Sequence, residues 1–268
     1  MKKVLFLVVI FIVVFASFYN IYQSKLDQQK NALKNKLAKI SITPKPEKAL
    51  TNIFVPYWDI PKDVSEIVKY DEIYYFSLTP DTNGLNKTNP NWSHLKDFAN
   101  LNIKSKYLTI SMLDQNQNSD ILKDKNWQEK IIKDSTTEAK IASFSGLILD
   151  LEMSPSLSSA TPDLITKFVT DFYKNAKQSD LRFYITLYGD NFYRARPYDL
   201  VELNKYCDKF LIMAYDLHKP TGEPGPNFPL DKGDKYPYDI KTLTDTLLTI
   251  IHPKSLNISL GCMATTGW

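Results

Sequence analysis

Two carboxylates close an apolar run in this sequence, and they are the residues best placed to do chemistry. The run reads Ser-Gly-Leu-Ile-Leu-Asp-Leu-Glu over residues 145–152, so Asp150 and Glu152 stand at its end. It is too short for a typical helix and apolar on both faces, which predicts a strand buried in a parallel sheet. Because side chains two apart on a strand share a face, the two carboxyl groups should point the same way.

Two neighbouring carboxyl groups move each other's pKa values apart. One can then hold a proton near neutral pH as a general acid while the other stays ionised, which is the division of roles that glycosidic bond cleavage uses. A purely structural alternative is that Asp150 caps the following segment and Glu152 pairs with a surface lysine. A further alternative is an unrelated α/β barrel in which both carboxylates bind Mg²⁺, because such a site needs only one or two of them.

The composition limits the other kinds of chemistry. With 268 residues and 43% hydrophobic content, the chain can bury the core of one large α/β domain or two small ones. Cys207 and Cys262 lie far apart, and His94, His218 and His252 are scattered. We therefore expect no metal site, no cofactor and no nucleophile paired with a histidine.

Charge and hydropathy divide the chain unevenly. Residues 1–46 carry eight lysines against one aspartate, or +7, which leaves 3 − 7 = −4 for the rest. A mildly acidic body is a poor match for nucleic acid. No charge occurs from Val4 to Ser24, and Lys2 and Lys3 precede this stretch. These features predict a single membrane-spanning helix with the N-terminus inside and the remaining chain outside the cytoplasm.

The expected organisation has three parts. Residues 1–24 are predicted to be a membrane anchor, or a signal segment that is removed from a secreted product; the lack of a clear small-x-small cleavage site favours the anchor. Residues 25–49 form a polar, basic stalk that ends in Thr-Pro-Lys-Pro and Glu-Lys-Ala, and residues 50–268 form the catalytic domain.

Within residues 50–268, short apolar runs alternate with longer amphipathic ones. The predicted strands are Ile53–Trp58, Glu72–Leu78, Lys106–Met112, Gly146–Glu152, Phe183–Leu187, Lys209–Tyr215 and Asn257–Cys262. Helices are expected at about 92–100, 126–143, 162–178, 198–206 and 240–251, with Asn91 and Thr161-Pro162 as start signals.

This alternation predicts a parallel sheet, either a (β/α)₈ barrel or a doubly wound sheet. A barrel gathers every strand end around one pocket, whereas an open sheet gathers only those near its switch point. Polar and aromatic residues stand at the carboxyl ends of three different strands: Tyr57, Trp58, Asp150, Glu152, Tyr215 and Asp216. No glycine-rich nucleotide motif is present. We therefore predict an α/β fold of the TIM (β/α)₈ type, incomplete with about seven strands and preceded by a transmembrane helix.

Two motifs of this sequence resemble those of glycoside hydrolase family 18, the chitinases and their relatives. Ser145, Ile148, Asp150 and Glu152 align with the DxxDxDxE that ends the family's fourth barrel strand. Met213-Ala214-Tyr215-Asp216 is similar to the M-x-Y-D of its sixth strand. Weaker similarities are found at residues 55–58, 75–76 and 260–268, so the resemblance covers residues 50–268.

The resemblance implies a role for each matching residue. Glu152 would protonate the leaving glycosidic oxygen and then activate water, and Asp150 would steer the N-acetyl group of the substrate. The substrate amide oxygen attacks the anomeric carbon in this family, so the mechanism would be substrate-assisted and retaining. Tyr215 would donate to that amide, and Asp216 would contact the distorted sugar. Substrate contacts are expected at Tyr57, Trp58, Phe76, Met213 and Trp268, although aromatic residues at strand ends are also ordinary packing.

The sequence also departs from the family. Ile148 stands where the family has an aspartate that relays between hydrogen bonds, and Ser145 replaces the first aspartate of the motif. Asp150 then lacks an acidic neighbour at position 148, so we expect an altered pH profile and lower turnover. The family also continues to an eighth strand beyond the point at which this sequence stops, and an open barrel exposes two strand edges, so we expect the natural protein to continue past Trp268.

The resemblance implies a glycosidase that cleaves polymers of β-1,4-linked N-acetylglucosamine, either chitin or the glycan strand of peptidoglycan in the cell wall. The alternative is a catalytically silent, lectin-like relative that keeps the pocket and binds N-acetylated sugars. The missing aspartates motivate this alternative, whereas the retained Glu152 opposes it. The expected partners are a polysaccharide and the membrane, with no nucleic acid, and the oligomeric state is left open.

Overall fold

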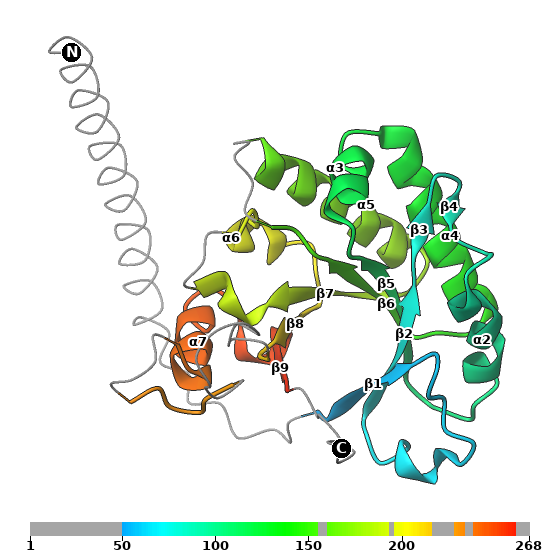
Figure 1. Ribbon diagram of the computed structural model, residues 1–268, viewed down its shortest axis with the longest axis horizontal. Helices are drawn as coiled ribbons and strands as arrows, with labels where there is room; N and C mark the ends of the chain where they lie inside the picture. Colours follow the sequence, from blue (N-terminus) through cyan, green and yellow to red (C-terminus); the bar gives the residue numbers. More distant parts are fainter. Residues whose placement is uncertain (1–49, 155–159, 193–195, 216–227, 234–237, 261–268) are drawn as a thin grey trace, which may run out of the picture. The chain divides into compact units, whose positions relative to one another are not determined.

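The structure is a computed structural model that describes residues 50–154, 160–192, 196–215, 228–233 and 238–260. Seven strands form one parallel sheet that curls into a half-barrel (Figure 1). Their order in the sheet is β1 (Asn52–Pro56), β2 (Glu72–Leu78), β5 (Lys106–Met112), β6 (Gly146–Leu151), β7 (Arg182–Tyr188), β8 (Lys209–Met213) and β9 (Leu256–Ser259). This arrangement confirms the α/β class and agrees with an incomplete TIM barrel.

The helices lie on the outer side of the curled sheet in Figure 1. They are α2 (Pro90–Ala99), α3 (Gln115–Ile121), α4 (Lys125–Ile141), α5 (Thr161–Gln178), α6 (Leu200–Leu203) and α7 (Ile240–Leu247), with short 3₁₀ turns η1 (Val64–Glu66), η2 (Gly189–Phe192) and η3 (Pro253–Ser255). A small antiparallel hairpin, β3 (Pro80–Asp81) and β4 (Gly84–Leu85), packs against α4.

Strand register decides which side chains share the inner face of the sheet. Thr109 pairs with Ile148, and Ile148 pairs with Tyr184, so these three side chains lie side by side on one face. The odd-numbered neighbours Leu147 and Leu149 belong instead to the large core between sheet and helices. Ile148 is fully buried in a separate inner cluster of buried residues, Tyr74, Tyr107, Ile148, Tyr184 and Leu211.

A buried ion pair closes the amino-terminal end of this inner face, and we call it the floor. The carboxylate of Glu72 accepts from Lys209 Nζ at 2.9 and 3.0 Å. Tyr74 donates to Glu72 at 2.7 Å and Tyr184 at 2.8 Å, while Tyr107 contacts the same carboxylate at 3.3 Å. The floor therefore joins β2, β5, β7 and β8 through one carboxylate.

The start of α2 follows the capping rules, with one shift from the sequence prediction. The side chain of Asn89, not Asn91, caps α2 by accepting from the backbone N–H of Asn91, and Pro90 takes the first turn. Asn91 is instead buried. The predicted start at Thr161-Pro162 is confirmed for α5.

The predicted localisation is corrected by the helices found. In the described ranges, no helix is long and apolar enough to cross a membrane. The longest of them, α5, buries Phe168 and Phe172 on one side but exposes lysines on the other, as an amphipathic helix on a sheet does. The segments predicted as anchor and stalk, residues 1–24 and 25–49, lie outside the described residues.

Candidate active site

The two carboxylates of the apolar run lie at the carboxyl end of β6, in the middle of the seven-stranded sheet. Asp150 is within the strand and 3% exposed, while Glu152 follows the last strand residue directly and is partly buried. Being two residues apart, both face the inner side of the sheet with Ile148. The carboxylate of Glu152 is close enough to raise the pKa of Asp150, although burial is the larger cause.

Hydroxyl groups from the two flanking strands occupy both oxygens of Asp150. Ser111 on β5, its register partner, donates to Oδ2 at 2.9 Å, and Thr186 on β7 donates to Oδ1 at 2.5 Å. Burial raises the pKa of Asp150 and the charge of Glu152 adds to this rise, while the hydroxyls of Thr186 and Ser111 oppose it, so that the pKa is about 6. The hydroxyls thus supply hydrogen bonds to Asp150 at a site where position 148 offers no carboxyl.

The raised pKa of Asp150 predicts a pH-dependent stability. The folded pKa of about 6 lies above the ordinary value of 3.8, so the folded protein binds this proton more tightly than the unfolded chain. The resulting stabilisation is complete below the unfolded pKa and is lost as pH rises through the folded pKa. Asp150→Asn removes this dependence while its amide still meets both hydroxyls.

Relative to wild type, the unfolding free energy of Asp150→Asn should therefore rise by roughly 2 kcal/mol between pH 4 and pH 7, because the full shift corresponds to about 1.4 kcal/mol per pKa unit and part of it is expressed below pH 4. Urea unfolding of both proteins at a series of pH values measures the difference. A difference that stays constant across this range would contradict the assignment.

Glu152 is held by contacts to both its side chain and its backbone. Tyr188, the last residue of β7, donates its hydroxyl to Glu152 Oε2 at 2.7 Å. The carbonyl oxygen of Glu152 accepts from Gln115 Nε2 at 2.7 Å and from Asn118 Nδ2 at 3.0 Å, both on α3. On either side of Glu152, Tyr198 donates its hydroxyl to the carbonyl of Leu151 at 2.6 Å and accepts from the N–H of Met153 at 2.8 Å. The segment that carries Glu152 is therefore fixed on both sides.

The β8 end contributes the residues of the second motif. Met213 ends β8, is partly buried and is the register partner of Tyr188. Tyr215 follows two residues later and is also partly buried. Asp216 and Trp268 lie outside the described residues. The structure thus places Met213 beside the strand whose tyrosine binds Glu152.

The predicted aromatic residues gather at a different part of the sheet, where β1 and β2 end. The backbone N–H of Tyr57 donates to the carbonyl of Phe76 at 2.8 Å, and the rings of Tyr57 and Trp58 make an edge contact with centroids 4.9 Å apart. Trp58 is 66% exposed, whereas Tyr57 and Phe76 are partly buried. An exposed indole face beside the sheet opening suits contact with a sugar ring.

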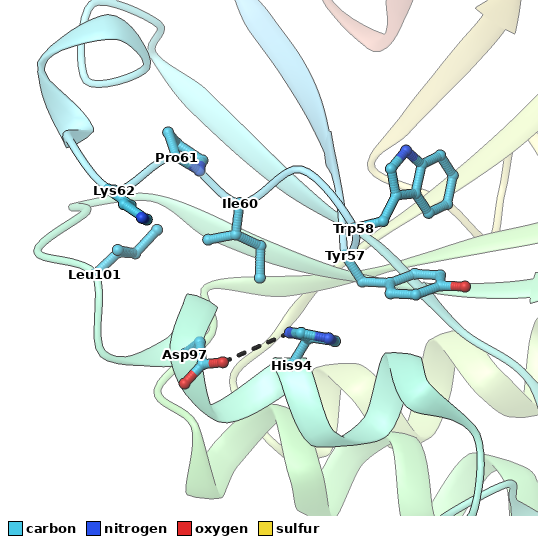
Figure 2. Close-up of a pocket in the computed structure, with 8 residues that line it drawn as sticks. All are labelled: Tyr57, Trp58, Ile60, Pro61, Lys62, His94, Asp97 and Leu101. Carbon is cyan, nitrogen blue, oxygen red and sulfur yellow. Dashed lines mark ion pairs between the residues drawn. The ribbon is translucent and has the colours of Figure 1, made fainter.

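A cavity of about 350 Å³ adjoins these aromatic residues. Figure 2 shows Tyr57 and Trp58 at one end of it, with Pro61, Lys62 and Leu101 at the other. Its remaining lining comes from Ile60 and from His94 and Asp97 on α2, which form an ion-pair contact at 3.6 Å. Among the residues that the structure describes, none from the β6 end lines this cavity, so it is distinct from the described surroundings of Glu152.

Within the part of the chain that the structure describes, no group of three histidine, cysteine, aspartate or glutamate residues is arranged to hold a metal ion. Asp150 and Glu152 bind hydroxyl donors instead. Cys207 is partly buried with a free thiol, while His218 and Cys262 lie outside the described residues.

Sequence reasoning missed the residues that contact the two carboxylates or the backbone beside them: Ser111, Gln115, Asn118, Thr186, Tyr188 and Tyr198. Three of these residues could have been inferred from the alternation of side chains along a strand. Every second residue of a strand points to the same face of the sheet, so Ser111, Thr186 and Tyr188 share the face of Asp150 once the register of β5 and β7 against β6 is known.

The comparisons with known proteins identify a family and a shared fold. The family model for "Glycosyl hydrolases family 18" matches residues 12–267. A search of curated proteins gave no match to the sequence.

Several solved structures share the fold. A Group IV chitinase of Ostrinia furnacalis, solved with allosamidin, superimposes with a TM-score of 0.68 at 14% identity, covering 79% of this chain and 65% of that protein. A chitinase of Cycas revoluta in complex with (GlcNAc)3 gives 0.63 at 18% identity, covering 78% and 68%. The spore cortex-lytic enzyme SleL of Bacillus cereus gives 0.59 at 15% identity, covering 80% and 51%. This chain therefore spans less than two thirds of the length of the first and third of these proteins.

Proposed function

Because the chain belongs to glycosyl hydrolase family 18, we propose that it is a glycosidase acting on polymers of β-1,4-linked N-acetylglucosamine. One observation carries this proposal: Asp150 and Glu152 share the inner face at the carboxyl end of β6, where each is held in place by hydroxyl donors from neighbouring strands. The carboxyl ends of parallel barrel strands are where active sites of this fold are built.

In the proposed mechanism, Glu152 gives its proton to the glycosidic oxygen as the bond from that oxygen to the anomeric carbon breaks. The acetamido oxygen of the same sugar attacks the anomeric carbon and forms a cyclic oxazolinium ion. Water then opens this ring and gives its proton to Glu152, which restores the acid. Two displacements at one carbon leave the anomeric configuration unchanged.

We assign Asp150 as the partner of the acetamido group of the substrate. Its buried carboxyl can hold a proton near neutral pH, since its pKa is raised to about 6, and it then has a donor as well as an acceptor to offer the amide. We assign Tyr215 and Asp216 to the acetamido group, and Tyr57, Trp58, Phe76, Met213 and Trp268 to the rest of the glycan, on the family pattern.

Both chitin and the glycan of peptidoglycan contain the required N-acetylglucosamine unit. The similarity to chitinases supports chitin, and the similarity to a spore cortex-lytic enzyme supports peptidoglycan. The proposed substrate class is therefore the linkage and its acetamido group, with the two polymers to be compared directly.

Product analysis tests the proposed function. The protein is incubated with chitohexaose and, separately, with peptidoglycan glycan strands, and the products are followed by mass spectrometry and proton NMR. We expect shorter oligosaccharides whose new reducing ends appear first as the β-anomer. An initial α-anomer would exclude the substrate-assisted retaining mechanism, and an absence of any cleavage would exclude the glycosidase.

A lectin-like protein is the second candidate, and one observation favours it. Ile148 is fully buried among aromatic side chains, so no carboxyl at that position can exchange a hydrogen bond with Asp150. A lectin would bind chitohexaose, as measured by calorimetry, but would leave it uncleaved after an incubation of many hours. The same incubation therefore separates the two candidates.

A further inference from the structure

We propose that Tyr188 is the positioning residue of the general acid, and that the pair formed by Arg196 and Asp190 holds Tyr188 in place. This inference rests on the proposed function, since it concerns how Glu152 is aimed at the glycosidic oxygen. The tyrosine lies outside both motifs that carry the family resemblance, and its contacts provide the evidence.

Tyr188 contacts only one of the two oxygens of Glu152. Its hydroxyl donates to Oε2 at 2.7 Å, which restricts the rotation of the carboxyl group. In the proposed mechanism Oε1 then carries the proton for the substrate. Among the residues that the structure describes, no other side chain donates to this carboxylate. A glutamate side chain has three rotatable bonds, so a single short hydrogen bond removes much of its freedom.

Asp150 and position 148 cannot take over this task. Both oxygens of Asp150 accept from hydroxyls, Oδ1 from Thr186 and Oδ2 from Ser111. Ile148 is apolar and fully buried. The orientation of Glu152 therefore comes from β7 rather than from its own strand.

Tyr188 is itself held by a charged group above its ring. The guanidinium of Arg196 lies 4.0 Å from the ring centroid, as in a cation–π contact. Arg196 also donates to both oxygens of Asp190, at 2.9 and 2.6 Å, and to the carbonyl of Met153 at 3.3 Å. The side chains of Arg196 and Asp190 are only 12% and 8% exposed, so this pair is shielded from solvent.

The hydroxyl of Tyr188 remains a donor throughout the working pH range. Burial raises its pKa above the ordinary value, and the hydrogen bond to Glu152 and the charge of that carboxylate raise it further. The nearby charge of Arg196 opposes this rise but is the weaker influence. Since the phenol keeps its proton, its hydroxyl can donate to Oε2 of Glu152 at any pH at which the acid works.

Leaving-group dependence separates a positioning role from a structural one. The test uses phenyl and 2,4-dinitrophenyl glycosides of N,N′-diacetylchitobiose with wild type and Tyr188→Phe. Departure of phenol needs a well-placed acid, whereas dinitrophenolate leaves without a proton. We expect Tyr188→Phe to lower kcat/KM, which reports bond cleavage before water is activated, by about 10–100-fold on the phenyl glycoside and by less than about 3-fold on the other.

A matched control uses the same chemical change elsewhere on the strand. Tyr184→Phe removes a buried hydroxyl from the same face of β7, at the floor, where it contacts Glu72. It should lower the melting temperature while the ratio of the two rates stays at the wild-type value. A second variant, Arg196→Gln, leaves Tyr188 intact but removes the charge above its ring, and it should shift the ratio in the same direction by a smaller factor.

The outcomes distinguish this inference from the proposed function. If wild type cleaves both glycosides and Tyr188→Phe loses activity equally on both, or on neither, the positioning role is overturned and the glycosidase stands. If wild type cleaves neither glycoside, the proposed function fails and this inference falls with it. A selective loss on the phenyl glycoside supports both.

Discussion

Replacing Glu152 by glutamine should lower the rate of chitohexaose hydrolysis by about 10²–10⁴-fold, the usual contribution of a general acid and base. Glutamine has no proton to give to a sugar leaving group and cannot accept one from water. Its amide oxygen can still accept from Tyr188, and the contacts of the backbone carbonyl to Gln115 and Asn118 are unaffected. The variant should therefore fold, bind the oligosaccharide and fail to cut it.

Reducing-end assays give the rates, and calorimetry with chitohexaose shows whether binding is retained. Glu129→Gln is the matched control, because it makes the same change at an exposed position of α4, on the outer side of the sheet. It should match wild type in rate and affinity. If Glu152→Gln cleaved chitohexaose at the wild-type rate, Glu152 would have no role as acid or base.

The strands were predictable because each is an apolar run bounded by polar residues. Glu72–Leu78 and Lys106–Met112 were predicted with the bounds that the structure shows, and the remaining strands differ by a few residues at their ends. In a parallel sheet covered on both faces, strand residues must be apolar whichever way they point, so the signal in the sequence is strong.

The helix α3 was not predictable from local pattern. Its sequence, Gln-Asn-Gln-Asn-Ser-Asp-Ile, has no apolar period, and polar residues of this kind are typical of a loop. It forms because Asp114 caps its first turn and because its amides bond to the ends of β5 and β6, with Asn118 donating to both Met112 and Glu152. These tertiary contacts outweigh the weak helix propensity of the segment.

The site was predictable only in part, for a similar reason. Asp150 and Glu152 stand out because carboxylates are rare at the end of a buried strand. Tyr188 does not stand out, because tyrosines at strand ends commonly serve only in packing. The sequence does not show which residue its hydroxyl contacts. Its role depends on the alignment of β6 with β7, in which Leu149 pairs with Ile185, and this alignment is a property of the folded sheet.

The largest effect on stability should come from the floor, where we expect Glu72→Leu to cost about 3–5 kcal/mol, as when a buried pair loses one partner. The Glu72 side chain is 4% exposed and that of Lys209 is 8% exposed. Without the carboxylate, the ammonium group of Lys209 would remain buried with no counter-charge. Urea unfolding of the two proteins at pH 7 measures the difference.

The pH dependence of the stability of wild type should also report the titration of Glu72. Burial by itself would raise the pKa of Glu72, but hydrogen bonds from Tyr74, Lys209 and Tyr184, with the charge of Lys209, outweigh it and hold the pKa below its ordinary value of 4.5. A lowered folded pKa means that this stabilisation is present above the unfolded pKa and is lost as pH falls through the folded one. Glu72→Leu should therefore lose the part of the acid destabilisation that wild type shows below about pH 4.5, near the unfolded value.

A double variant separates two contributions to the loss of stability in Glu72→Leu: the unpaired charge of Lys209 and the tyrosine hydroxyls that lose their acceptor. Glu72→Leu/Lys209→Met removes both charges, so it should be more stable than Glu72→Leu alone, even though Tyr74 and Tyr184 still lack their acceptor. If the double variant were no more stable than the single one, the loss of stability would come from the tyrosine hydroxyls and not from a buried lysine without a counter-charge.

The floor joins the amino-terminal ends of the strands, whereas Asp150 and Glu152 lie at their carboxyl ends. Glycosidase activity measured well below the melting temperature should therefore survive in all these variants, since the floor stabilises the sheet without touching the residues that would cut the sugar.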